Sequence, residues 1–329
     1  MPTLTTSRVK RALHLALTAA CFVALPSQAD TGYPSRPIRM IVPWTPGVPA
    51  DAATRIIAER MSVSMKQPVV VENRPGASGT IGYAEVLRQP ADGHTVYVLS
   101  SASLVSPLLY PGRRIEFTKE LDAVGHIHWS YNALVVPVES KLGSLDAIVS
   151  QAKKDPGKLS FASGGNGTPA HLAGAAFSRY AGIHTAHVPY VQFPLAINDL
   201  LGGRVDFMFM TTESAIPQVT GGKMRALAVT SAKRLPALPN VPTMVEMGVP
   251  NFVFRSFETM TVKAGTPKPI VERLNKELNK ALASPEVREQ FTANGWDIEA
   301  MSPEQITKVL ASESERWLQL GHDLQVKLD

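Results

Sequence analysis

The turn at residues 163–173 carries the residue types best suited to hold a small anion. Its sequence, Ser-Gly-Gly-Asn-Gly-Thr-Pro-Ala-His-Leu-Ala, joins an apolar run at 159–162 to a helix-like run at 170–180. The first backbone N–H groups of a helix lack partners within the helix, and the helix dipole places positive charge behind them. This turn is therefore predicted to form a cradle for an anion such as a carboxylate.

Two further turns, at 43–51 and 74–80, have the same character. Each follows an apolar run and precedes helix-like sequence. Three such turns in a chain of alternating strands and helices predict one cleft for an acidic ligand. Asp51 adds negative charge at a helix start, so we assign it to helix capping and scaffold, with the ligand carboxylate meeting loop amides or bridging water.

Several other side chains have two interpretations, and the sequence leaves both open. Arg255 could hold a carboxylate with its forked guanidinium, or it could pair with Glu258 on a solvated face. Tyr190 and Phe193 could form a wall of the cleft or pack in a domain core. His171, in the first turn of the helix after the glycines, could contact the ligand or hydrogen-bond the scaffold.

The patterns of several enzyme classes are missing. The glycine spacing at 76–82 is not that of a dinucleotide-binding loop, and the chain has neither a phosphate-binding loop nor a G-x-S-x-G nucleophile motif. The pairs His126/His128 and His184/His187 lack the cysteines or the H-E-x-x-H spacing of a zinc site. We therefore predict no catalytic residue, no metal and no cofactor.

The order of elements indicates an α/β fold in two units. Strands at 38–43, 69–72 and 95–99 alternate with helices, and strand-like sequence at 132–138 leaves this first unit. A second series of the same rhythm covers 145–230, and the run 252–262 returns. Two such connections predict two hinge strands with a cleft between the units. Helices at 266–283, 285–294 and 303–320 close the chain, the last opened by a capping box at Ser302.

We therefore expect a two-lobed fold, each lobe a mainly parallel sheet flanked by helices. Residues 30–130 and 253–329 form the predicted lobe 1, and residues 131–252 form lobe 2. The C-terminal helix at 303–320 could pack on either lobe, because Ile306, Leu310 and Trp317 share one mostly apolar face.

The N-terminal segment has the features of a secretory signal peptide. Basic residues in the first eleven positions precede an apolar run at 12–25 and the small-residue site Ser27-Gln28-Ala29, so we predict a signal peptide at 1–29 with cleavage after Ala29. Cys21, the one cysteine, lies within it and leaves lipidation as an alternative. Without the peptide, 30 basic residues face 28 acidic ones. This balance disfavours nucleic acid, and no later apolar run has membrane length.

Five segments together resemble the Bug family, the periplasmic solute-binding proteins of tripartite tricarboxylate transporters. They are YPSRPIR at 33–39, VVVENRPGA at 69–77, HVPY at 187–190, DLLGG at 199–203 and RALAVTS at 225–231. The resemblance extends from Tyr33 to the C-terminus. It implies a Venus-flytrap protein of the type II-like periplasmic-binding-protein fold that binds a carboxylate and delivers it to a membrane permease.

The resemblance also implies site residues. Family members hold one carboxylate between two loops, which map onto 45–50 and 76–79 here. A second-lobe loop maps onto 163–171, and an acidic strand residue maps onto Asp206. With the side chains discussed above, the predicted ligand-binding residues are Trp44, Pro46, Gly47, Val48, Ala50, Gly76, Ala77, Ser78, Gly79, Ser101, Ser163, Gly164, Gly165, Thr168, His171, Tyr190, Phe193, Asp206, Arg255 and Phe257.

The chain departs from the family pattern in three places. Val48 stands where a second glycine is usual, residues 191–193 replace a Lys-Gly pair, and residues 257–259 replace an aromatic residue followed by glycine. Phe193 and Phe257, added near the expected cleft, favour a bulkier or aromatic acid over a small four-carbon acid.

The predicted function is capture of a carboxylate, such as a dicarboxylate, tricarboxylate or aromatic acid, in the periplasm. The predicted partners are this small molecule and the transporter membrane subunits, with the protein a monomer. Two alternatives remain: a ligand sensor for a two-component kinase, and a periplasmic hydrolase or lyase that uses His171 and Asp206.

Overall fold

The computed structural model describes residues 32–190 and 192–325. The predicted signal peptide, its cleavage site after Ala29 and Cys21 lie outside these residues. Residues from Arg36 onward form one compact unit, which contains every element described below. Within the described residues, no helix combines the length and the apolar character needed to cross a membrane.

The first three strands form a parallel arrangement, as predicted. β1 (Ile38–Val42) lies between β2 (Val69–Asn73) and β3 (Thr95–Ser100). β1 and β3 are almost completely buried because apolar residues fill both of their faces. The helical segments in this part are α2 (Pro49–Met65), η1 (Ala77–Gly79), α3 (Thr80–Leu87), η2 (Ser101–Val105), α4 (Ser106–Leu109) and α5 (Phe117–Glu120).

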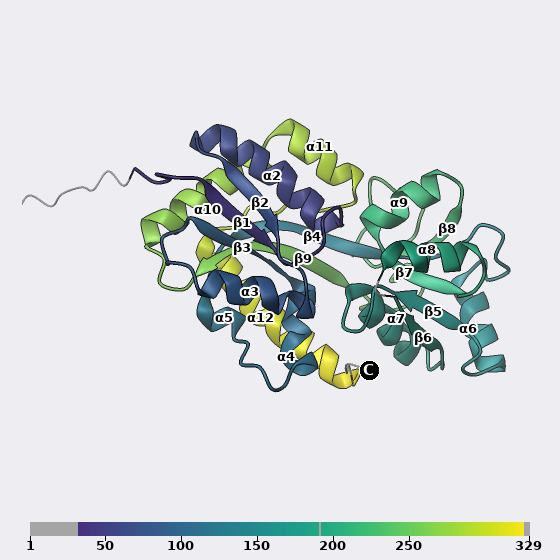
Figure 1. Cartoon of the computed structure of the whole chain (residues 1–329). Helices are drawn as coiled ribbons and strands as arrows, with labels where there is room; N and C mark the ends of the chain where they lie inside the picture. The colour runs from purple at the N-terminus through teal and green to yellow at the C-terminus, as the bar shows by residue number, and fades with distance from the viewer. Residues whose placement is uncertain (1–31, 191, 326–329) are drawn as a thin grey trace, which may run out of the picture. The chain divides into compact units, whose positions relative to one another are not determined.

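Two long strands connect the two halves of the sheet. β4 (Leu121–Pro137) and β9 (Arg255–Lys263) pair antiparallel, and β9 also pairs with β3, so this half of the sheet has the order β2-β1-β3-β9-β4. β4 then continues into the second half (Figure 1). The predicted strand at 132–138 is only the end of β4. Buried polar side chains at His126, His128 and Ser130 interrupt the apolar run and concealed the rest.

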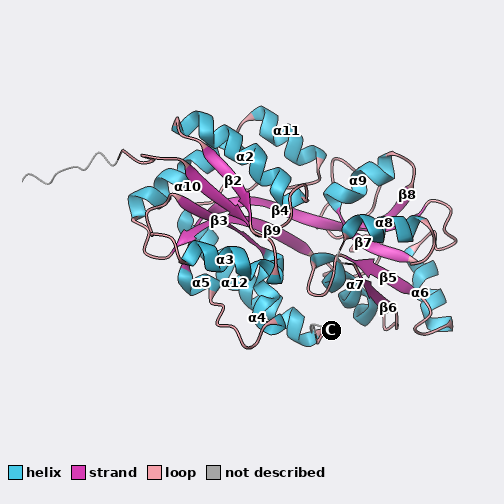
Figure 2. Cartoon of the chain, viewed as in Figure 1, coloured by secondary structure: helices cyan, strands magenta, loops and turns pink. Residues whose placement is uncertain are grey.

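The second half of the sheet repeats the strand and helix alternation. Parallel strands β7, β5 and β6 follow β4 in that order, and β8 pairs with the other edge of β4. Helices lie against both half-sheets (Figure 2). The elements are α6 (Leu145–Lys154), β5 (Ser160–Ser163), α7 (Pro169–Tyr180), β6 (Ala186–Pro189), α8 (Phe193–Leu201), β7 (Phe207–Thr211), α9 (Thr212–Thr220) and β8 (Met224–Val229).

Each half-sheet is mixed, which corrects the expectation of mainly parallel sheets. The parallel pairs come from the strand–helix–strand units, and every antiparallel strand pair among the described residues involves β4 or β9. These two strands run between the halves in opposite directions, so they must pair antiparallel with each other. β1 to β3 and β9 fall within the predicted lobe 1, and β5 to β8 within lobe 2. The lobe boundaries themselves stay a prediction.

Three helices follow β9: α10 (Lys268–Leu282), α11 (Pro285–Ala293) and α12 (Pro303–Asp323). α12 begins with the predicted capping box, in which Ser302 and Gln305 exchange hydrogen bonds. Its buried face includes Ile306, Leu310 and Trp317. α12 contacts β4 and η2, so the helix packs on the half of the sheet formed by β1, β2, β3 and β9.

Candidate functional site

The predicted loops follow the carboxyl ends of parallel strands in both halves of the sheet. β3 ends at Ser100, which pairs in register with Glu258, and Glu258 pairs in turn with His128 of β4. β7 ends at Thr211, which pairs with Asn132 of β4. Only four residues of β4, about 13 Å, separate these two positions. The carboxyl ends of the two half-sheets therefore converge on one stretch of β4, and ligands of open α/β sheets bind outside such ends.

The loop at 163–168 joins β5 to α7 and is held by its own hydrogen bonds. Gly165 has a φ of +112°, which a side chain would strain. The Ser163 hydroxyl accepts from Gly165 N at 3.1 Å, and Thr168 donates to Gly165 O through Oγ1 at 2.7 Å. Thr168 is the N-cap of α7, and its side chain accepts from His171 N. The prediction of several unpaired amides is corrected, because those of Gly165, Thr168 and His171 bond within the loop.

His171, a residue of α7, hydrogen-bonds this loop through its side chain. Its Nδ1 accepts a hydrogen bond from Gly167 N at 3.1 Å, and its ring stacks on His187 with centroids 4.0 Å apart. His187 in turn lies 2.7 Å from the Ser163 hydroxyl through Nε2, and its ring stacks on Phe161. The two histidines thus buttress the glycine loop. Of the two interpretations of His171, the structure supports scaffold hydrogen bonding.

Tyr190 and Phe193 lie beside the same loop. The nearest atom to a Cβ built on Gly164 is Cδ2 of Phe193, at 3.6 Å, so this ring borders the loop. Tyr190 donates from its hydroxyl to Asp199 of α8 at 2.7 Å. Burial and this hydrogen bond raise the pKa of Tyr190 above its ordinary value. Their role as a wall of the cleft stays a prediction.

The loop between β1 and α2 is organised around Asp51. α2 begins at Pro49 with Val48 as its N-cap, so Asp51 lies in the first turn and the predicted capping role is wrong. The Asp51 carboxylate accepts from Gly47 N at 2.9 Å and from Arg55 and Asn73. Burial opposes ionisation, but these hydrogen bonds outweigh it and hold the pKa of Asp51 below its ordinary value. The Gly47 amide, predicted to face the ligand, is therefore already paired.

We expect Asp51→Ala to destabilise the protein by about 2 kcal/mol at neutral pH, because the buried carboxylate satisfies three donors. Asp51→Asn keeps an acceptor for Gly47 N, so this variant should lose less stability than Asp51→Ala. Urea unfolding of the three proteins measures both changes.

The pH dependence of this effect follows from the lowered pKa of Asp51. A lowered pKa stabilises the fold above the unfolded-state value of about 3.9, and the stabilisation is lost as the pH falls through the folded-state value. The difference in the free energy of unfolding between the parent and Asp51→Ala should therefore decrease below pH 4. If this difference stays constant down to pH 2, the ionised Asp51 carboxylate does not contribute to the stability of the fold.

The loop at 76–79 carries backbone conformations that the sequence did not reveal. Gly76 and Gly79 have φ of +121° and +90°, and between them Ala77 and Ser78 have φ of +47° and +51°. Such angles in residues with side chains cost on the order of 1–3 kcal/mol each and concentrate at functional sites. A Cβ on Gly79 would lie 2.6 Å from the Ser103 hydroxyl. This loop therefore packs closely on the segment that follows β3.

Ser101, directly after β3, and Phe257, on β9, are buried in contact with each other. The Ser101 hydroxyl accepts from Phe257 N at 3.3 Å, and the Phe257 ring packs edge-on against Trp129. Both residues are at most 1% exposed. Their contacts belong to the core, so the structure does not place the Phe257 ring on a surface where it would add bulk beside a ligand.

Arg255 is held by a different partner from the one predicted. Its guanidinium lies 3.7 Å from the centroid of Trp129 and pairs with Glu313 of α12 at 3.2 Å. Glu258 is three residues away on β9, so its side chain projects from the opposite face of the strand. The proposed ion pair between Arg255 and Glu258 is therefore wrong.

Asp206 lies away from the other predicted residues. It precedes β7, and its carboxylate accepts from Ser160 N at 2.7 Å and from the Ser160 hydroxyl at 3.1 Å. Ser160 is the first residue of β5 and Ser163 the last. About 10 Å of strand thus separates Asp206 from the glycine loop. This position corrects the grouping of Asp206 with the ligand-binding loops.

His126 and His128 lie in the core. The His128 ring stacks on Trp296 at 4.6 Å, and His126 lies 4.5 Å from Trp129. Burial lowers the pKa of each to about 3, so both are neutral at physiological pH. In the described part of the chain, no group of three or more His, Cys, Asp or Glu side chains could hold a metal ion.

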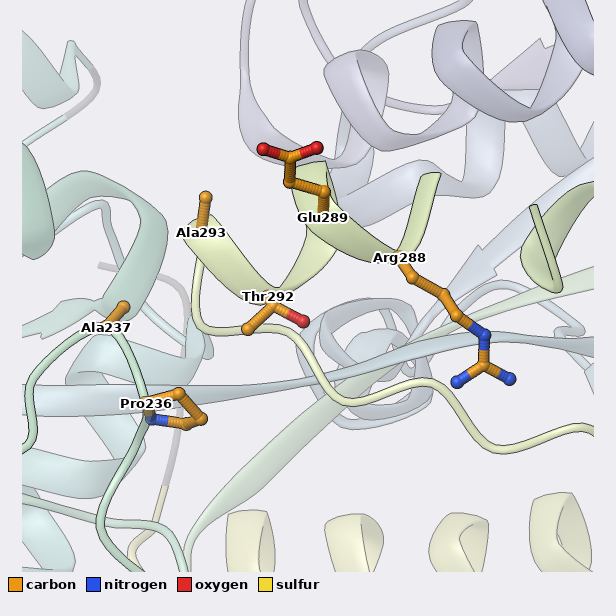
Figure 3. A pocket seen from close by; sticks show the side chains of 6 residues that line it. All are labelled: Pro236, Ala237, Arg288, Glu289, Thr292 and Ala293. Atoms are coloured by element: carbon orange, nitrogen blue, oxygen red, sulfur yellow. The ribbon is translucent and has the colours of Figure 1, made fainter. Parts of the chain in front are cut away.

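A surface hollow lies between α11 and the segment at 236–237 (Figure 3). Four of its lining side chains come from α11 and two from the segment at 236–237. It contains none of the residues predicted to bind the ligand. The lining residues are Pro236, Ala237, Arg288, Glu289, Thr292 and Ala293.

Two half-sheets that are joined by crossing strands, with their loops converging on one stretch of β4, define a periplasmic binding protein fold. Residues 53–326 match the sequence profile of the tripartite tricarboxylate transporter family receptor, TctC. The chain belongs to this family, which includes the Bug proteins.

Individual relatives agree with this assignment. A UPF0065 protein from the tcbD-tcbE intergenic region of Pseudomonas sp. strain P51 is 39% identical, over 95% of this chain and 93% of its own. Protein BugT of Bordetella pertussis is 36% identical, over 94% of this chain and 95% of its own. The structure of R. palustris Rpa4515 with adipate superposes with a TM-score of 0.83 at 29% identity, covering 90% of this chain and all of that chain.

Proposed function

We propose that this protein captures a carboxylate at the carboxyl ends of its parallel strands and presents it to the membrane subunits of a tripartite tricarboxylate transporter. The observation that carries the proposal is the convergence of the loops after β3 and β7 on one stretch of β4. Family membership supports the transporter as partner. The adipate bound to Rpa4515 supports a dicarboxylate as ligand.

The glycine loop supplies one side of the proposed site. It opens α7, a helix of 12 residues, so the positive end of the helix dipole lies at the loop. The Ser163 hydroxyl, which lies 3.1 Å from Gly165 O and 2.7 Å from His187 Nε2, would have to give up its present acceptor to donate to a ligand oxygen. The strained loop at 76–79, directly before α3, supplies the other side. A carboxylate would thus meet neutral donors from both halves of the sheet.

We further propose that the protein acts as a monomer without catalysis, after cleavage of the signal peptide behind Ala29. The pair of residues that a hydrolase would use, His171 and Asp206, lies at opposite ends of β5. The ligand would bind the closed form of the protein better than the open form, so ligand binding would favour the closed form. The permease subunits would then recognise this closed form.

Thermal melting of the mature chain, residues 30–329, tests the proposed function. We expect at least one member of a panel of aliphatic and aromatic acids to raise the melting temperature by about 5 °C at one hundred times its Kd, and to be recovered chemically intact. Phe193 is a bulky side chain beside the glycine loop, so the panel should span four-carbon, six-carbon and aromatic acids. A flat response across the panel would overturn the proposal, as would recovery of a modified acid.

A further inference from the structure

Glu258 is a buried acid that has no basic partner in the described part of the chain. It is 8% exposed, and none of the described residues hydrogen-bonds its Oε2 atom. Burial raises the pKa of Glu258 to about 8, so the group carries a proton at neutral pH. A buried carboxyl with an unmade hydrogen bond is costly to keep. Its position at the carboxyl end of β3, opposite Ser100, places it where the loops of the proposed site converge.

Glu213 approaches the same place from the other half of the sheet. It lies in the first turn of α9, directly after β7. Its Oε2 accepts from the Ser130 hydroxyl at 3.1 Å and from Trp296 Nε1 at 3.2 Å. Burial raises the pKa of Glu213 as well. Two acids with raised pKa values therefore reach the crossing strands from different elements.

The strand register places these carboxyls close together. Ser130 pairs with Ser256 across β4 and β9, and His128 pairs with Glu258. Residues two apart on a strand share a face and lie about 7 Å from each other. The Glu213 carboxyl, bound to Ser130, thus lies on the same face as Glu258, about one residue pair away. The charge of Glu213 also contributes to the raised pKa of Glu258.

No cation balances the two acids. The ion pairs among residues 32–190 and 192–325 involve neither Glu213 nor Glu258. His128, the titratable group opposite Glu258, is kept neutral by burial and stacks on Trp296. The other groups facing the pair are the Ser100 and Ser130 hydroxyls, the indole of Trp296, and the hydroxyls of Thr211 and Thr212, the latter donating to Glu213 Oε2 at 3.4 Å. The described residues therefore supply no positive charge to balance an ionised Glu258 and no donor to its Oε2 atom.

We propose that Glu213 and Glu258 form a subsite for an ammonium group, so that the ligand is an amino-substituted carboxylate. This inference rests on the proposed function, because the ligand's carboxylate must occupy the loops nearby. An ammonium group supplies three N–H donors and a positive charge that would balance an ionised Glu258, and one nitrogen about 2.8 Å from each acceptor can join carboxylate oxygens up to about 5.6 Å apart. A ligand end bearing only carboxylate could not balance the charge of an ionised Glu258. Binding should ionise Glu258 and release its proton to solvent.

Calorimetry on the mature protein with matched pairs of acids tests this inference. The pairs are succinate and aspartate, glutarate and glutamate, and adipate and 2-aminoadipate, each measured at pH 7 in phosphate and in Tris. We expect the amino member of at least one pair to bind ten or more times more tightly than its partner. The two buffers should report release of up to one proton.

Glu258→Gln should abolish both the preference for the amino acid and the proton release. Glu277→Gln is the matched control, since Glu277 is also buried with an unpartnered Oε2 atom but pairs with Arg273 on α10. Its ligand preference should equal that of the parent. Tight binding of the plain diacids with no gain from the amino group would overturn the inference and leave the proposed function standing. Failure of every acid to bind would overturn both.

Discussion

Gly165→Val is expected to weaken carboxylate binding about thirtyfold and to change the melting temperature of the free protein little. Gly165 has a φ of +112°, where a β-branched residue costs on the order of 2 kcal/mol, and 1.4 kcal/mol corresponds to a factor of ten in Kd. The nearest atom to a Cβ at this position, the Tyr190 carbonyl oxygen, is 4.0 Å away. The loop therefore has room to relax. Relaxation would break the hydrogen bonds of Gly165 with Ser163 and Thr168 that set the loop's shape.

Gly182→Val is the matched control for this variant. Gly182 also has a positive φ, +60°, in the same half of the sheet, and a Cβ there meets nothing within 4 Å. It follows α7 at the helix end away from the glycine loop. Titration calorimetry should show parent-like affinity for Gly182→Val. Equal affinity of Gly165→Val and the parent would remove the loop at 163–168 from the binding site.

The positions of most strands and helices could be predicted because each carries a local signal. Apolar runs of four to six residues indicated β1, β3 and β5, and the glycine turn before α7 followed from composition alone. The capping box at Ser302 needed only two residue types at the right spacing. These features depend on neighbours in the chain, so the sequence is enough to find them.

What could not be predicted depends on contacts between distant segments. The first part of β4 contains the buried residues His126 and His128. Their burial is explained by ring contacts with Trp129 and Trp296. Asp206 was grouped with the glycine loop by resemblance, but its partner is Ser160 at the other end of β5. The positive φ of Ala77 and Ser78 gives no signal in composition, because residues with side chains seldom adopt it.

The acids Glu213 and Glu258 show the same limit at the candidate site. Sequence reasoning considered Glu258 only as a partner for Arg255 and did not consider Glu213. Their proximity depends on the register of β4 with β9 and on the hydrogen bond from Ser130 to Glu213. A run of alternating residues at 255–258 could have shown that Arg255 and Glu258 point to opposite faces. The position of α9, which carries Glu213, could not have been predicted from such a pattern.

Trp317→Ala is expected to lower the free energy of unfolding by about 3–5 kcal/mol. Trp317 is completely buried, and its ring packs edge-on against Phe254 with centroids 5.4 Å apart. Removing the indole would leave a cavity between α12 and the segment that enters β9. Urea unfolding, followed by circular dichroism, measures the loss. Glu315→Ala, at an exposed position on the same helix, should change stability by less than 0.5 kcal/mol.

Trp317→Phe separates the two contributions of this side chain. The indole N–H of Trp317 is buried and finds no hydrogen-bond partner among residues 32–190 and 192–325, and such a group costs about 1–3 kcal/mol. Phenylalanine keeps most of the apolar contact and removes the unpaired donor, so Trp317→Phe should lose far less stability than Trp317→Ala. A loss as large in Trp317→Phe would mean that the indole finds a partner in solution. A loss below 1 kcal/mol in Trp317→Ala would mean that α12 contributes little to the fold, and the packing of Arg255 against Glu313 would then lose its support.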